Sequence, residues 1–83
     1  MIKEKLNYLI KQSGQSQKDI AEKFGLLVQN MNRKIIKEAL KPQELIKFAE
    51  ATGCEIHFIS KETKKTVVKF DLNDITEKEK DND

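Results

Sequence analysis

The 83-residue chain has few of the residues that brace or punctuate a small fold: one cysteine, one proline, three glycines and no tryptophan. With Cys54 alone, no internal disulfide can form, and a reducing compartment is the simpler assumption. Long apolar runs are also missing, because Lys3, Glu4 and Lys5 interrupt the first candidate, residues 2–10. This excludes a signal-peptide core or a membrane span there. We expect one soluble, cytoplasmic domain with a modest core and no membrane partner.

The residue types that carry catalysis or bind metals are equally sparse. His57 is the only histidine, and no Cys, Asp or second His stands at metal-ligand spacing around it. Cys54 has no plausible His or Asn partner set for nucleophilic chemistry. Glycine-rich phosphate loops and catalytic-triad patterns are absent as well. We therefore expect no enzyme, no metal and no small-molecule cofactor.

Charged residues are abundant and unevenly placed. They make up 36% of the chain, with a net charge of +2. Residues 1–54 hold ten Lys/Arg against six Asp/Glu, a balance of +4, whereas residues 55–83 hold six against eight, a balance of −2. The positive excess favours a phosphate-binding surface in the N-terminal part.

The most informative segment is 16–36, which has the pattern of two short helices joined by a tight turn at Gly25. Ser16 can cap the first helix, with Asp19 three residues on as its reciprocal partner. The apolar positions follow helical spacing: Ile20, Ala21, Phe24, Met31 and Ile35. A glycine-punctuated helix pair with a small Ala21 at the inner crossing is the architecture that places one helix in a DNA groove.

Helical signals also flank this segment. One further helix is predicted from Ile2 to the Ser13-Gly14 pair, and another from Pro42 to Gly53. Residues 55–59 and 66–72 alternate between apolar and polar side chains, as strands of a hairpin do, with the polar stretch 60–65 as its loop. The chain is therefore predicted to be mainly α, with a helical domain at 1–54, a β-hairpin at 55–72 and a charged flexible tail at 73–83.

Residues 17–36 resemble the helix-turn-helix of phage-repressor-type regulators, Cro/CI-like and also called XRE-like. The matching positions are Gln17, Ile20, Ala21, Gly25, Leu26 and Met31. The wider run 2–58 resembles small repressor-like proteins often carried on mobile elements, which append a short β-segment to the last helix. The resemblance implies a four-helix repressor-like helix-turn-helix domain and sequence-specific binding of double-stranded DNA in transcription regulation.

The resemblance also implies roles for individual residues. Helix 27–36 would be the recognition helix, and its base-reading residues would be Val28, Gln29, Asn32 and Arg33. Arg suits guanine, Gln and Asn suit adenine, and Val suits the thymine methyl. The residues expected on phosphates are Gln17, Lys18, Lys34, Lys37 and Lys41.

Three positions depart from the family pattern. Leu27 stands where Ser or Thr usually caps the recognition helix, Val28 where a polar base reader is common, and Lys34 where an apolar residue is frequent. The apolar pair at 27 and 28 suits thymine methyls, and it equally suits a partner protein. Alternatives are therefore a protein-interaction adaptor, an antitoxin whose charged tail folds on a toxin, and a merely solvated polar helix face.

The hairpin is expected to form a homodimer interface. Repressor-like domains usually bind DNA as two-fold dimers, and an isolated hairpin is marginally stable in water. Two strands could pair across the two-fold axis, or Phe58 and Phe70 could enter a partner's core. The interface residues would be Ile56, Phe58, Val68 and Phe70. The alternative is a monomer whose hairpin packs only on its own helices.

Overall fold

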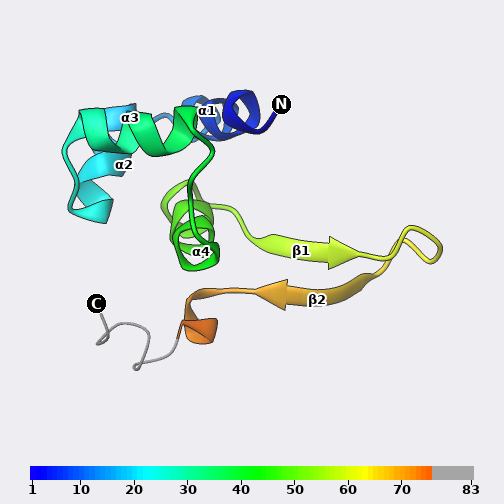
Figure 1. Cartoon of the computed structure of the whole chain (residues 1–83). Coiled ribbons are helices and arrows are strands. Elements are labelled where there is room, and N and C mark those ends of the chain that lie inside the picture. Colours follow the sequence, from blue (N-terminus) through cyan, green and yellow to red (C-terminus); the bar gives the residue numbers. More distant parts are fainter. Residues whose placement is uncertain (76–83) are drawn as a thin grey trace.

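The computed structural model describes residues 1–75, which form four helices, a two-stranded hairpin and a short 3₁₀ helix (Figure 1). The elements are α1 (Ile2–Gln12), α2 (Gln17–Phe24), α3 (Val28–Ile36), α4 (Pro42–Ala51), β1 (Ile56–Ile59), β2 (Thr66–Phe70) and η1 (Leu72–Asp74). The predicted mainly helical fold with a C-terminal antiparallel hairpin is confirmed. Of the predicted tail, residues 76–83 lie outside the described residues.

The core lies where all four helices meet. Its fully buried large side chains are Ile20, Met31, Ile35 and Phe48, and Leu6, Ile10 and Ala21 complete the buried cluster. Leu6 and Ile10 on α1, and Met31 and Ile35 on α3, are four residues apart, so each of these helices turns one apolar stripe inward. Within residues 1–75, no helix is long and apolar enough to cross a membrane.

The turn between α2 and α3 forms as predicted. The Ser16 hydroxyl accepts from the Asp19 N–H at 3.1 Å, and the Asp19 carboxylate accepts from the Ser16 N–H at 2.9 Å. Gly25 then ends α2 with φ 70° and ψ 29°. Open space surrounds the position where its Cβ would lie, so the left-handed backbone, and not crowding, is what favours glycine there.

The end of α3 uses a residue that no sequence signal marked. Its turn repeats the geometry of the glycine-terminated helices, since the Ala39 N–H donates to the Lys34 carbonyl at 2.9 Å. The residue in the left-handed position is Glu38, with φ 53°. A side chain with a Cβ is disfavoured in this conformation, so the link from α3 to α4 contains local strain.

The hairpin projects away from the helices (Figure 1). β1 and β2 pair antiparallel, with Ile56 opposite Phe70 and Phe58 opposite Val68, and the register shifts between Phe58 and Ile59. Every residue of β2 is exposed. The hairpin is therefore an arm rooted near α4, and most of it does not lie on the helical core.

The second strand ends earlier than predicted. β2 stops at Phe70, and the expectation that it continues to residue 72 is wrong. Asp71 starts η1 instead: its carboxylate accepts from the Asn73 N–H at 2.9 Å, and its own N–H donates to Asp74 at 2.8 Å. Ile75 is buried, with 8% of its surface exposed. Residues 73–75 thus belong to the folded part, beyond the predicted start of the tail.

Replacing Glu38 by glycine should stabilise the protein. Glycine adopts φ near +53° without a Cβ penalty, and we expect a gain of about 1 kcal/mol, or roughly 4–8 °C in Tm for a domain of this size. Thermal unfolding followed by circular dichroism measures it. Glu38→Ala is the matched control, because it removes the same charge and keeps the Cβ. Equal gains in both variants would show that the charge, and not the backbone, is the cause.

Candidate nucleic-acid interface

Helix α3 divides cleanly into a buried and an exposed side. Met31 and Ile35 are fully buried against the core. The other side presents the four residues predicted to read bases, all of them exposed: Val28, Gln29, Asn32 and Arg33. Their spacing of one, three and one residues places them on one helical face. The structure therefore brings these four side chains together on one outward surface.

The N-terminus of α3 carries no side-chain cap. Leu27 occupies the cap position with an extended backbone, and no side-chain bond satisfies the first helical N–H groups. Its side chain is 63% exposed, and that of Val28 is 40% exposed. The uncapped, apolar tip predicted from the sequence is present in the structure.

Arg33 is held along its own helix. One guanidinium nitrogen, Nη1, donates to the Asn30 Oδ1 at 3.2 Å, and Asn30 lies one turn nearer the helix start. The guanidinium has five N–H donors in a planar fork. A single bond to Asn30 therefore orients the group and leaves most of its donors directed elsewhere.

The residues predicted to contact phosphate do not form one uniform set. Lys18, Lys37 and Lys41 are exposed, at the start of α2 and on the link between α3 and α4. Gln17 is half-buried at the first turn of α2, where its amide Nε2 donates to Asn7 Oδ1 at 3.4 Å. Three of the five are therefore solvent-facing cations.

Lys34, which is also predicted to contact phosphate, forms an ion pair within the protein. Its ammonium lies 3.0 Å from Glu44 Oε2, and both side chains are largely covered. Glu44 also accepts from the Lys41 backbone N–H at 2.8 Å, at the start of α4. Position 34 faces α4 because it lies on the inner flank of α3, next to the buried Ile35. Lys34 thus takes part in an ion pair that joins α3 to α4.

Sequence reasoning missed one residue of the exposed α3 face. Ile36 is 52% exposed, four residues after Asn32 and eight after Val28. The same helical spacing that grouped the other four positions could have included it. The exposed face therefore has an apolar residue near each end and polar side chains between them.

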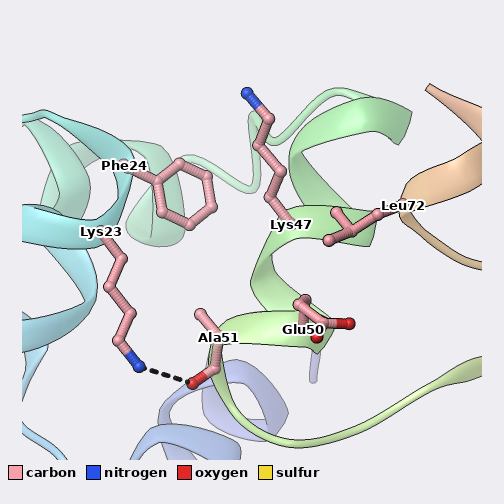
Figure 2. A pocket seen from close by; sticks show the side chains of 6 residues that line it. All are labelled: Lys23, Phe24, Lys47, Glu50, Ala51 and Leu72. Carbon is pink, nitrogen blue, oxygen red and sulfur yellow. Dashed lines mark hydrogen bonds between the residues drawn. The ribbon is translucent and has the colours of Figure 1, made fainter. Parts of the chain in front are cut away.

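The surface of residues 1–75 has further features outside α3. The hollow in Figure 2 lies between the end of α2 and α4; Lys23 donates to the Ala51 carbonyl at 3.4 Å across it, and the Lys47 ammonium points away. No cluster of three or more His, Cys, Asp or Glu that could hold a metal occurs in this part of the chain. His57 lies beside Glu55 at 2.8 Å on the exposed hairpin.

Comparison with protein-family models, with curated proteins and with solved structures gives no match. The geometry of α2 and α3 and the side chains that they expose therefore carry the functional inference. What this arrangement can do chemically is bind: α3 offers hydrogen-bond donors and acceptors on a convex helix face with cations at its margins.

Introducing a cap at position 27 should stabilise α3. We expect Leu27→Ser to raise the free energy of unfolding by about 1 kcal/mol, because its hydroxyl can accept from a first-turn N–H. Little packing is lost, since the leucine is mostly exposed. Chemical denaturation of the wild type and of Leu27→Ser measures the change. Leu27→Ala removes the same side chain without supplying an acceptor, so an equal gain there would rule out capping.

The Glu44 carboxylate should make the free energy of unfolding depend on pH. Partial burial raises its pKa, but the Lys41 N–H and the Lys34 ammonium outweigh this and leave the pKa below its ordinary value of 4.5. A lowered pKa stabilises the fold above the unfolded-state pKa, and that contribution is lost as pH falls through the folded-state pKa. We expect Glu44→Gln to cost about 0.5–1 kcal/mol at pH 7, with the difference from wild type shrinking below about pH 4.

Urea unfolding across this pH range measures that difference. Glu50→Gln is the matched control, since it removes an exposed carboxylate from the same helix. A Glu44→Gln penalty that stays constant down to pH 2 would contradict the ion-pair and capping role.

Proposed function

We propose that the protein is a sequence-specific DNA-binding transcriptional regulator of the repressor-like helix-turn-helix class, acting as a homodimer. The observation that carries this proposal is the division of α3, which buries Met31 and Ile35 completely and exposes its polar face as one continuous surface. A helix fixed by its inner side and exposed along its outer side suits insertion into the major groove.

The exposed face has the chemistry for direct base readout. Arg33 pairs bidentately with guanine O6 and N7, and Gln29 and Asn32 pair with adenine N6 and N7. Val28 and Ile36 contact thymine methyl groups at the two ends of the face. Each good bidentate pair discriminates against a wrong base by about 1–3 kcal/mol.

The cations at the margins of this face supply affinity without sequence preference. Lys18 lies at the start of α2, and Lys37 and Lys41 follow α3, so the two groups flank the reading residues along the chain. Neutralising phosphates releases counterions, which makes binding strongly salt-dependent. The N-terminus of α2, with Gln17 in its first turn, adds backbone N–H donors for one more phosphate.

A second candidate function rests on the apolar residues of the same helix. Leu27, Val28 and Ile36 are 63%, 40% and 52% exposed, which suits docking onto a partner protein. In that case the domain is an adaptor or an antitoxin that keeps the helix pair without reading DNA. Salt separates the two functions, because DNA binding weakens steeply as salt rises and apolar docking hardly responds.

Selection of bound sequences from random double-stranded DNA tests the proposed function directly. We expect the purified protein to enrich a short motif, repeated as inverted half-sites about one helical turn apart. If no motif is recovered and the affinity for DNA does not change with salt, DNA reading is excluded and the adaptor function is favoured.

Arg33 should be the most discriminating reader. We expect Arg33→Ala to weaken binding to the selected site by about 5- to 150-fold for each half-site, which corresponds to losing one bidentate pair of about 1–3 kcal/mol in each half-site. Its fold should persist, because the side chain lies outside the core. Fluorescence anisotropy with the selected duplex and with a duplex changed at the guanine measures both affinity and discrimination.

Arg33→Lys is the matched control for this variant. It keeps the positive charge and lacks the planar fork, so it should retain salt-dependent affinity and lose the guanine preference. Wild-type affinity and specificity in Arg33→Ala would remove α3 from the interface.

A further inference from the structure

The hairpin has two unlike faces. Ile56, Phe58, Val68 and Phe70 lie together on one face, which we call the apolar hairpin face. The Phe58 and Phe70 rings there are 5.7 Å apart between centroids. His57 and Lys69, which are paired with each other across the two strands, lie on the other face. Phe58 remains 61% exposed and Val68 47% exposed, so the described chain covers this face only in part.

The apolar hairpin face continues into a groove beside α4. The groove encloses about 330 Å³, and its lining contains no charged side chain: Leu40, Pro42, Leu45, Ile46, Ile56, Phe58 and Phe70. A cavity of about 150 Å³ with such a lining already accommodates a benzene ring. We call this hollow the apolar groove. It is suited to aromatic or aliphatic side chains and not to phosphates or bases.

The rest of the same chain offers no filling for the apolar groove. Residues 1–75 leave it open, with Leu45 on its α4 side still 37% exposed. The remaining segment, residues 76–83, consists of Thr, Glu, Lys, Asp and Asn and has no apolar side chain. Neither residues 1–75 nor residues 76–83 therefore supply an apolar side chain that fills the groove.

We infer that the occupant is a second copy of this chain, with the exposed Phe58 ring of each copy packed into the apolar groove of the other. A two-fold interface must be self-complementary, so the same patch has to supply both a protruding group and a hollow. Phe58 forms one wall of its own apolar groove and is still 61% exposed, so the protruding ring and the hollow lie on the same patch. The inference rests on the proposed homodimer and assigns the surface that forms it.

Packing through the face is favoured over pairing through the strand edges. The register shift between Phe58 and Ile59 disrupts the ladder. Lysines at 61, 64, 65 and 69 line the loop and the second strand. Bulges and lysines are the devices by which proteins block edge-to-edge pairing. The apolar hairpin face has no comparable obstacle, since no charge lies on it.

The available surface matches what a stable dimer needs. An aromatic side chain buries about 150–250 Å², so Phe58 alone offers roughly 90–150 Å² of uncovered area. With Val68, Phe70 and Leu45, the apolar part reaches roughly half of the ~800 Å² per partner that a standard interface buries. Interfaces of this size surround such an apolar core with a polar rim.

Sedimentation equilibrium of the full chain tests the inference. Wild-type protein should have twice the 9.6 kDa mass of one chain. We expect Phe58→Asp to be monomeric, whereas Ile59→Asp, one residue along and 57% exposed in wild type, should remain dimeric. Phe58→Ala should raise the dissociation constant at least about a hundredfold, because two buried rings are lost per dimer.

Leu45→Asp changes the same groove from the α4 side. Its result does not depend on whether a hairpin with a substitution still folds. Circular dichroism checks that each variant keeps its helices. The inference is overturned if wild type is monomeric at all concentrations. It is also overturned if Phe58→Asp or Leu45→Asp stays dimeric, or if Ile59→Asp dissociates together with Phe58→Asp.

The outcome is separable from the proposed function. Arg33→Ala lies on α3, outside the groove, and should leave the mass unchanged. A monomer that still selects a DNA motif overturns the dimer and its surface and leaves DNA reading standing. A Phe58-dependent dimer that selects no motif upholds the surface and overturns DNA reading.

Discussion

The structure depends on the close crossing of α2 and α3 at Ala21. This residue is 1% exposed, and Ile20, Met31 and Ile35 around it are fully buried. A methyl side chain lets the two helices approach, and larger side chains on either side fill the remaining space. The Leu26 N–H donates to the Ala21 carbonyl at 2.9 Å, so the turn is tied to the crossing itself. The direction of the outer face of α3 follows from this contact.

Helix α4 fixes the other end of that arrangement. Lys34 on α3 pairs with Glu44, and Glu44 in turn binds the first turn of α4 through the Lys41 N–H. One carboxylate therefore serves as a helix cap and as a link between helices. Surface ion pairs contribute little by themselves, but this one is partly covered and adds to the burial of Phe48 in the same region. The orientation of α3 thus depends on the apolar crossing with α2 and on the directional ion pair between Lys34 and Glu44.

Much of the fold could be predicted because its signals are local. The Ser16–Asp19 cap, the glycine turn and the helical spacing each act within a few residues, and they agree with one another. The same spacing predicted the buried side of α3, and the resemblance implied the residues of its exposed face. Two features could not be read this way. Glu38 adopts a left-handed backbone without the residue type that normally marks it, and Lys34 meets Glu44 only because α4 folds back on α3.

The position of the hairpin relative to the helices could not be predicted from the sequence either, because tertiary packing decides it. A two-stranded sheet is marginal alone, and the groove beside α4 is lined from the hairpin by Ile56, Phe58 and Phe70. Under the proposed function, one recognition helix reads few base pairs and needs a second at a fixed distance. Burying the apolar hairpin face in a partner meets both requirements together. Under that proposal, hairpin packing and operator reading are coupled, because the same contact covers the hairpin and sets the distance between the two α3 helices.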